Sequence, residues 1–228
     1  MNTWQLVRWL VPAPLKEKLG VETVKAMRPP MMFPTYSADV VRELEATRDY
    51  ARYATLALAI QRLESDEISG AFAELGVHQG ATSRFIHRQA PSRRLYLFDT
   101  FKGFPPESLE QKRDDRFRDT SQEAVAEFVG EGPNVILRAG SFPQTAAGLE
   151  EERFALVMLD FDLYKSAVDA FHFFYPRLVP GGYFFLHDFN SPESNYGISR
   201  AANEFLQDKP ERLVEIPDIW GSAVFRKH

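Results

Sequence analysis

Two clusters of ionisable side chains directly follow short apolar runs in this chain of 228 residues. Asp160 and Asp162 follow one run, and His187 and Asp188 follow the next. Charged groups at the end of a buried strand are costly unless they bind something. Parallel strands end at the same edge of a sheet, so the four side chains could converge on one site. Carboxylates would suit Mg²⁺ or Ca²⁺, and the imidazole would shift the preference toward Mn²⁺, Fe²⁺ or Zn²⁺. A hydrogen-bonded His187 with no direct role is the alternative.

A glycine-containing stretch after an earlier apolar run suits the charged end of a ligand. Gly76 permits a tight turn, and Gly80 lets the backbone approach a ligand at the start of a helix. His78 stands where a G-x-G-x-x-G motif has its second glycine, which disfavours a pyrophosphate. Glu74 lies near the buried end of the strand and needs a partner. The α-ammonium of an amino-acid ligand would serve, and a salt bridge to an arginine is the alternative.

Two further strand ends point to an adenosine. Asp99 ends the next apolar run, 23 residues after Gly76, where an acid can accept both ribose hydroxyls. Nicotinamide-dinucleotide domains carry the same signal. After the third run, Gly140 and Ser141 lie where an adenine edge would be hydrogen-bonded, and Phe142 could stack on it. An ordinary turn before a helix explains these three residues equally well.

Short apolar runs alternate with helical patterns after Asp66, which predicts an α/β fold with a doubly wound, mostly parallel sheet. The predicted parallel strands are Gly70–Leu75, Arg94–Phe98, Val135–Arg138, Phe154–Leu159 and Tyr183–Leu186. The predicted helices between them are Thr82–Gln89, Ser121–Val129, Pro143–Leu149 and Tyr164–Leu178. An antiparallel pair, Leu213–Ile216 and Ala223–Arg226, closes the sheet, so that seven strands are expected and the last is antiparallel.

The first part of the chain has a different texture. Residues 1–35 are apolar and interrupted by prolines, and residues 37–64 predict one helix with Ser37 as its cap. We therefore divide the chain into an N-terminal helical extension, residues 1–66, and a ligand-binding domain, residues 67–228. The stretch Phe104–Asp119 predicts a long loop beside the ligand site, either a lid or a solvated excursion.

Composition excludes several classes of function. A net charge of −5 and a pI near 5.6 do not favour a nucleic-acid partner. The absence of cysteine excludes disulfides, thiolate zinc sites and cysteine nucleophiles, and it fits a reducing compartment. The apolar run near the N-terminus is too short and interrupted to span a membrane. We expect a cytoplasmic protein that forms homo-oligomers.

Several ungapped blocks, in the same order, resemble macrocin-type O-methyltransferases over roughly residues 35–228. The blocks are Glu74-x-Gly76, Leu97–Pro105, Leu159-Asp160-x-Asp162-x-Tyr164-x-Ser166, Tyr175–Tyr183 and the tail Pro217–Lys227. Members of that family methylate sugar hydroxyls, typically on glycosylated natural products. The resemblance implies a Rossmann-like class I methyltransferase fold and S-adenosylmethionine as cofactor. The residues then expected to bind this cofactor are Glu74, Gly76, Gly80, Thr82, Ser83, Asp99, Thr100, Phe101, Gly140, Ser141, Phe142 and Asp160.

The resemblance also implies a divalent cation, most often Mg²⁺, with Mn²⁺ or another metal as alternatives. Asp160 and Asp188 match its ligands, and Asp162 matches the general base. His187 departs from the family pattern, which has an acid there, so it is a candidate either for a third ligand or for the base. The methyl acceptor would be a sugar or another small molecule with a hydroxyl group. A nicotinamide-dependent oxidoreductase and a non-catalytic cofactor-binding relative are the competing interpretations.

Overall fold

The computed structural model describes residues 38–47, 49–104, 114, 116–130 and 132–228. The chain divides into two compact units, Met1–Asp39 and Val40–His228. The second unit carries the sheet and includes a helix that the sequence reading assigned to the N-terminal extension. The predicted cap Ser37 and residues 1–35 lie outside the described residues, as does most of the predicted loop after Phe104.

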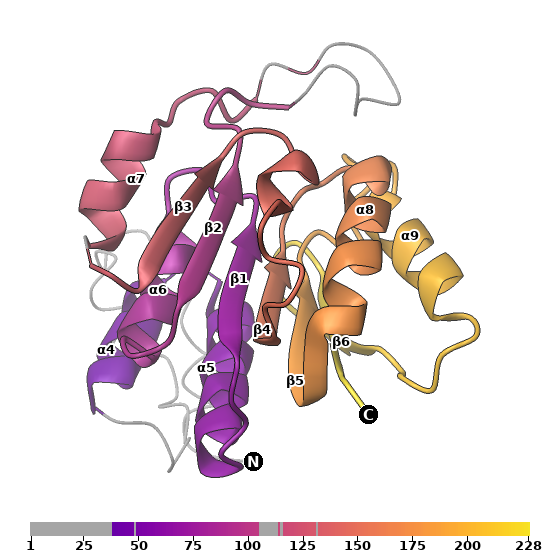
Figure 1. The fold of residues 1–228 in the computed structure, drawn as a ribbon, viewed down its shortest axis with the longest axis horizontal. Helices are drawn as coiled ribbons and strands as arrows, with labels where there is room; N and C mark the ends of the chain where they lie inside the picture. Colours follow the sequence, from indigo (N-terminus) through magenta and orange to yellow (C-terminus); the bar gives the residue numbers. More distant parts are fainter. Residues whose placement is uncertain (1–37, 48, 105–113, 115, 131) are drawn as a thin grey trace, which may run out of the picture. The chain divides into compact units, whose positions relative to one another are not determined.

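A seven-stranded sheet with the order β3-β2-β1-β4-β5-β7-β6 forms the centre of the second unit (Figure 1). Strands β1 to β5 pair in parallel, and β7 is antiparallel to both β5 and β6. Six strands therefore run in one direction, and the predicted doubly wound sheet is confirmed. The strands are β1 Ala71–Leu75, β2 Leu95–Asp99, β3 Val135–Ala139, β4 Phe154–Leu159, β5 Leu178–Leu186, β6 Val214–Ile216 and β7 Ser222–Arg226.

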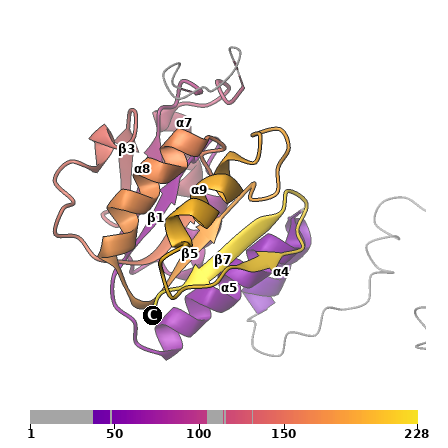
Figure 2. The same ribbon diagram turned by 90° about the vertical axis from the view of Figure 1, so that its right-hand side faces the viewer.

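Helices lie on both faces of this sheet, with α8 and α9 on one face and α5 and α6 on the other (Figures 1 and 2). Because both faces are covered, a central strand such as β4 is apolar along its whole length, and every residue of β4 is buried. The α-helices are α4 Ala38–Ala46, α5 Tyr50–Ser65, α6 Ala81–Gln89, α7 Gln122–Val129, α8 Tyr164–Phe174 and α9 Gly197–Leu206. Two short 3₁₀ turns, Gln144–Ala146 and Tyr175–Arg177, complete the set in the described part of the chain.

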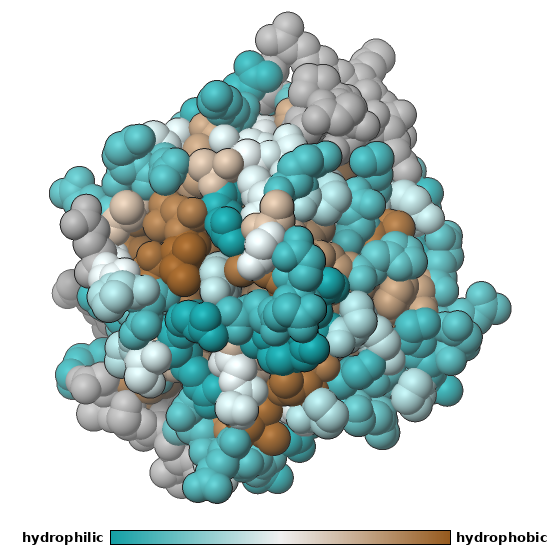
Figure 3. Space-filling model, in the orientation of Figure 1, coloured by the Kyte–Doolittle hydropathy of each residue, from teal (hydrophilic) through white to brown (hydrophobic). Residues whose placement is uncertain are grey.

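Aromatic side chains fill the layer between the sheet and α8. Phe171 and Phe174 of α8 are fully buried, and Phe174 packs edge-on against Phe154 and Phe98. Hydrophilic residues cover most of the face shown in Figure 3, and apolar residues reach it as separate groups. The aromatic cluster thus belongs to the core and does not form a substrate platform.

The prediction of one helix over residues 37–64 is wrong, because the chain breaks between α4 and α5. The hydroxyl of Thr47 accepts a hydrogen bond from the backbone N–H of Asp49 at 3.2 Å, a local bond that competes with the helical pattern. Asp49 has φ −109° and ψ 67°, outside the helical region, and its side chain is buried. The break therefore turns a carboxylate toward the interior.

Three other parts of the chain differ from the prediction. Residues 143–149 contain only the 3₁₀ turn Gln144–Ala146, because Ala147 takes a ψ of 134°, outside the helical region. Pro176 ends α8 early, and β5 begins at Leu178 instead of residue 183. Helix α9 was not predicted, although Ile198, Ala201, Ala202 and Leu206 follow a helical period and are buried.

No helix in the described ranges is both long and apolar enough to cross a membrane. The predicted homo-oligomer and the cytoplasmic location stay predictions.

Candidate active site

A cavity of about 480 Å³ opens at the carboxyl ends of β1, β2, β4 and β5. Ligands of doubly wound sheets bind at this edge, outside the strand ends. The predicted site residues that line it are Glu74, Gly76, Thr82, Asp99, Thr100, Gly140, Phe142, Asp160, Asp162, His187 and Asp188. Gly80, Ser83, Phe101 and Ser141 do not line it and stand one step behind or beside it.

The turn after β1 brings two strand ends into direct contact. Gly76 has φ +86°, and a Cβ atom there would lie 2.0 Å from the carbonyl oxygen of Asp160. The backbone N–H of Asp160 in turn donates to the carbonyl oxygen of Leu75 at 2.7 Å. Only glycine allows both the left-handed conformation and this approach. Gly76 therefore sets the distance between the glycine loop and the acidic cluster.

Glu74 is buried at the end of β1 with 1% of its surface exposed. The Ser83 hydroxyl donates a hydrogen bond to Glu74 Oε2, and within the described part of the chain no arginine or lysine forms an ion pair with the carboxylate. Burial raises the pKa of Glu74 to about 8, with the Ser83 hydrogen bond opposing the shift. Within the described residues the Glu74 carboxyl group thus has a hydroxyl partner but no cationic one, and its binding to the ammonium group of a ligand stays a prediction.

Asp99 ties the glycine loop to the end of β2. Its Oδ2 accepts hydrogen bonds from the backbone N–H groups of Val77 and His78 at 2.7 and 2.9 Å. Its Oδ1 accepts one bond from the N–H of Phe101 at 2.7 Å. A carboxylate has about four lone-pair sites, so Oδ1 retains room for a ribose hydroxyl.

The turn after β3 lies beside Asp99. The N–H of Gly140 donates to the Asp99 carbonyl oxygen at 2.9 Å. Phe142 lines the cavity, but its ring also stacks on Phe174 at 5.8 Å and meets Phe98 edge-on. One face of Phe142 is therefore part of the core, and only the remaining surface can meet a ligand.

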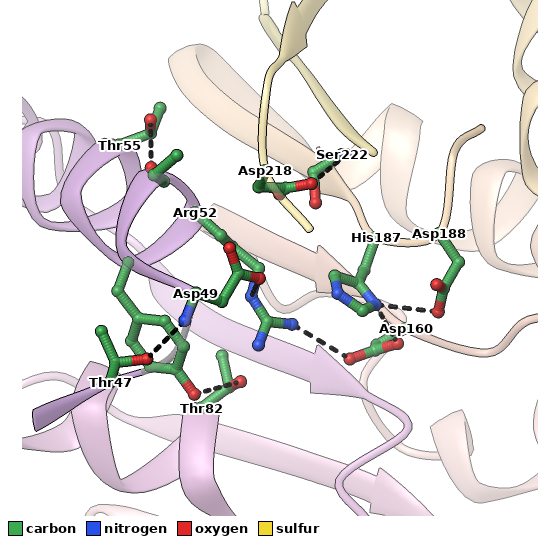
Figure 4. A network of polar contacts seen from close by, with 12 residues as sticks. Thr47, Asp49, Arg52, Thr55, Thr82, Asp160, His187, Asp188, Asp218 and Ser222 are labelled. Atoms are coloured by element: carbon green, nitrogen blue, oxygen red, sulfur yellow. Dashed lines mark hydrogen bonds and ion pairs between the residues drawn. The ribbon is translucent and has the colours of Figure 1, made fainter. Parts of the chain in front are cut away.

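The side chains of Asp160, His187 and Asp188 converge as predicted (Figure 4), and Asp162 lines the same cavity. His187 Nδ1 lies 2.8 Å from Asp160 Oδ1 and 2.9 Å from Asp188 Oδ2. Asp162 and Asp188 have φ values of +61° and +52°, an uncommon conformation for residues with a Cβ atom. Such conformations persist where the surrounding structure imposes them, and they gather at functional sites.

Crowding of charges shifts the pKa values of this cluster. Burial raises the pKa of Asp162 to about 9, and Asp188 adds to the shift. Burial also acts on Asp188, but the hydrogen bonds from His187 and Asp162 outweigh it and lower the pKa of that carboxyl. For His187, burial lowers the pKa, while Asp160 and Asp188 outweigh it and raise the pKa to about 10. Perturbed groups of this kind are typical of catalytic and metal sites.

The sequence matches the family Macrocin-O-methyltransferase (TylF) over residues 47–226. The chain belongs to this family. A relative from Streptomyces olivaceus, 8-demethyl-8-(2,3-dimethoxy-alpha-L-rhamnosyl)-tetracenomycin-C 4'-O-methyltransferase, is 26% identical over an alignment 195 positions long, and the match covers 78% of this chain and 73% of the relative. The macrocin-O-methyltransferase match leaves no support for an oxidoreductase.

Two solved structures share the fold. The O-methyltransferase NovP has a TM-score of 0.66 and 21% identity, over 78% of this chain and 80% of its own. CalS11, a calicheamicin methyltransferase, has a TM-score of 0.60 and 20% identity, over 95% and 93%.

Helix α5 supplies two residues that line the cavity of this macrocin-O-methyltransferase family member. Neither Arg52 nor Tyr53 was predicted as a site residue from the sequence. Arg52 is largely buried and lines the cavity, with its Nη1 3.7 Å from Asp160 Oδ2 and its Nε 2.9 Å from Asp49 Oδ2. Tyr53 also lines the cavity, and its hydroxyl lies 3.2 Å from the hydroxyl of Thr82. No spacing links these residues to the strand ends, so only the folded chain shows their role.

His78 replaces the second glycine of a G-x-G-x-x-G motif, and the structure adds contacts between His78 and residues 117–120. Its Nε2 lies 2.8 Å from Asp119 Oδ1, its carbonyl oxygen accepts from the Thr120 hydroxyl, and Gln79 donates to Asp119 Oδ2 at 2.9 Å. Phe117 packs edge-on against the His78 ring and lines the cavity. In this macrocin-O-methyltransferase family member, residues 116–120 therefore cross the glycine loop at the cavity rim.

Proposed function

We propose that the protein transfers a methyl group from S-adenosylmethionine to a hydroxyl group of a sugar or a related small natural product, assisted by a divalent cation. The observation that carries the proposal is the convergence of Asp160, Asp162, His187 and Asp188 in the same cavity as Glu74, in a chain that belongs to the macrocin-O-methyltransferase family.

The polar groups that line the cavity suit the amino-acid part and the adenosine part of S-adenosylmethionine. The buried carboxylate of Glu74 would bind the α-ammonium of the methionine part, and Asp99 would bind the ribose. Gly140 and the exposed part of Phe142 would border the adenine. The buried guanidinium of Arg52 lies at the same cavity and suits the α-carboxylate.

Replacing Glu74 by glutamine is expected to stabilise the ligand-free protein at high pH and to weaken cofactor binding. The folded-state pKa of about 8 lies above the ordinary 4.5, so the Glu74 contribution to stability is complete below about pH 4.5 and is lost as the pH rises through 8. The unfolding temperature of the wild type should thus fall below that of the variant by several degrees at pH 8.5. The exposed Glu127→Gln on α7 is the control, and a pH-independent difference would contradict the assignment.

The acidic cluster fits a cation. The ligand atoms of Asp160, His187 and Asp188 all lie within 4.8 Å of one another. His187 Nδ1 lies 2.8 and 2.9 Å from one oxygen each of Asp160 and Asp188, so an imidazole nitrogen and two carboxylate oxygens, all common ligands of divalent cations, lie close together. A cation held by these three residues would lower the pKa of the acceptor hydroxyl and orient its oxygen.

The protein's own groups would complete the reaction. Asp162 would accept the proton of the acceptor hydroxyl, or His187 would do so where it does not hold the cation. The oxygen would attack the methyl carbon, and the bond from that carbon to the sulfonium sulfur would break in the same step. S-adenosylhomocysteine would leave, and no covalent enzyme intermediate is needed. The name of the Streptomyces relative, which acts on a rhamnosyl group, favours a sugar hydroxyl as the acceptor. A phenol or another diol would be compatible with the same chemistry.

Chelation tests the metal, and thermal stability with added ligands tests the cofactor. We expect methyl transfer from S-adenosylmethionine to a rhamnosylated acceptor to stop in a strong chelator and to return when Mg²⁺, Mn²⁺ or Zn²⁺ is added. The metal that restores the highest rate identifies the preference that His187 creates. Full activity in the chelator would end the metal proposal. Stabilisation against heat by NAD but not by S-adenosylhomocysteine would end the cofactor proposal.

A further inference from the structure

Unpartnered polar atoms gather around His187, next to Arg52 at the wall of the cavity. In the described part of the chain, nine buried side-chain nitrogen and oxygen atoms have no hydrogen-bond partner. Buried polar atoms are almost always paired with protein or with ordered water, so a group of them without protein partners favours ordered water or a polar ligand at that place. Six of the nine belong to five neighbouring residues: Asp49 Oδ1 and Oδ2, Arg52 Nε, His187 Nε2, Asp218 Oδ2 and Ser222 Oγ.

These residues come from three distant parts of the sequence. Asp49 and Arg52 stand at the start of α5, and Asp218 and Ser222 belong to the β6–β7 turn and the first residue of β7. We call these four residues the rear cluster. Figure 4 shows the free ring nitrogen of His187 turned away from Asp160 and Asp188, toward the side of Asp49 and Arg52. Asp49, His187 and Ser222 are only 6%, 7% and 1% exposed.

Contacts within the rear cluster are too sparse to satisfy its polar atoms. Arg52 Nε lies 2.9 Å from Asp49 Oδ2, close enough for an ion pair, but the N–H is not aimed to form a hydrogen bond. Asp218 accepts from the backbone N–H of Ser222 with Oδ1 only, at 2.9 Å. Burial raises the pKa of Asp49, Arg52 opposes this, and the nearby charge of Asp218 adds to it.

The chemistry of the unpartnered atoms identifies what would satisfy them. Three carboxylate oxygens accept hydrogen bonds, Arg52 Nε donates, and the Ser222 hydroxyl does both. An anion would meet the carboxylates of Asp49 and Asp218, and a metal ion would meet the guanidinium of Arg52. Water can donate and accept, and buried water commonly makes about three such bonds.

We propose that ordered water lies between the rear cluster and His187, and that Asp49 and Asp218 hold the Nε2 edge of His187 through it, so that Nδ1 faces Asp160 and Asp188. A partner on the outer nitrogen of a histidine orients the ring and decides which nitrogen faces the chemistry. Asp49 and Asp218 are thus positioning residues, and their effect on the reaction rests on the proposed function.

Nuclear magnetic resonance of the ligand-free protein tests the water directly. The chain has five histidines, and the His187 signals in ¹⁵N-histidine-labelled protein can be assigned by comparison with His187→Gln. We expect an Nε2–H proton of His187 that exchanges slowly with solvent and shows a cross-peak to bound water. Asp49→Asn and Ser222→Ala should each shift or remove it. Thr55→Val, which removes a hydroxyl that bonds Ala51 on the same helix, should leave it unchanged.

Two results would overturn the proposal at this level. One is the absence of an Nε2–H signal with a water contact in the wild type. The other is the same signal, unchanged, in both Asp49→Asn and Ser222→Ala. Neither result depends on methyl transfer, so they leave the proposed function untouched, and failure of the proposed function leaves the water intact.

Kinetics tests the positioning role. Asp49→Asn and Asp218→Asn should lower kcat by about 10- to 100-fold, as losses of outer partners of a liganding histidine commonly do. In Asp218→Asn the KM for S-adenosylmethionine should stay the same, and Thr55→Val should keep the wild-type kcat. Unchanged kcat in both asparagine variants would refute the role of these residues in positioning His187.

Discussion

The variant Asp160→Asn is expected to lose methyl transfer, by on the order of 10³-fold in kcat, and to keep nearly full affinity for S-adenosylmethionine. Asp160 Oδ1 contacts His187, and its Oδ2 faces Arg52, so its charge lies at the centre of the acidic cluster. An amide keeps the shape but removes the charge that would hold a cation. Single-turnover methylation and calorimetric titration with S-adenosylhomocysteine measure the two effects separately.

Asp169→Asn is the matched control for this substitution. Asp169 lies on α8 and pairs with Lys165 four residues earlier at 3.4 Å, on the outer side of the helix. The same change of charge there should leave both quantities at wild-type values. If Asp160→Asn weakens cofactor binding as much as turnover, the carboxylate supports the cofactor and not the metal.

The second large effect is expected for Gly76→Ala, which should destabilise the fold by about 2–5 kcal/mol and abolish cofactor binding. The new Cβ atom would lie 2.0 Å from the carbonyl oxygen of Asp160 and 2.7 Å from its carbonyl carbon, both backbone atoms that cannot rotate away. The positive φ adds its own cost for alanine. Denaturant unfolding and a binding titration give the two numbers.

Gly148→Ala separates crowding from backbone strain. Gly148 has nearly the same φ, +83° against +86°, but a Cβ atom there would meet nothing within 4 Å. This control should cost only about 1–2 kcal/mol and should leave the cofactor affinity unchanged. Equal losses in the two variants would show that strain alone accounts for the effect at Gly76.

The sheet could be predicted because its strands are buried on both faces. A strand such as Phe154–Leu159 must then be apolar throughout, and that pattern is visible without a structure. Helix boundaries were less accessible, since the break at Thr47–Asp49 depends on a side chain that bonds the backbone locally. Helix α9 was not predicted, although the helical spacing of its apolar residues is visible in the sequence.

The site divides in the same way. Strand ends of a parallel sheet must meet at one edge, so Asp160, Asp162, His187 and Asp188 could be brought together by topology alone. Arg52 and Tyr53 could not, because helix packing decides where they point and an apolar helical pattern hides them. The orientation of His187 also needed the structure, since the sequence does not show whether Nδ1 or Nε2 faces Asp160 and Asp188.

Arg52 lies in the first turn of α5, so the length of that helix fixes where its guanidinium lies relative to Asp160. An α-helix turns about 100° and rises about 1.5 Å per residue. A single residue gained or lost within α5 after Arg52 would therefore turn the guanidinium away from Asp160, and Asp49 would move with it. A change in the length of α5 would therefore displace two buried charged groups, whereas a change in the length of a surface loop would leave them in place.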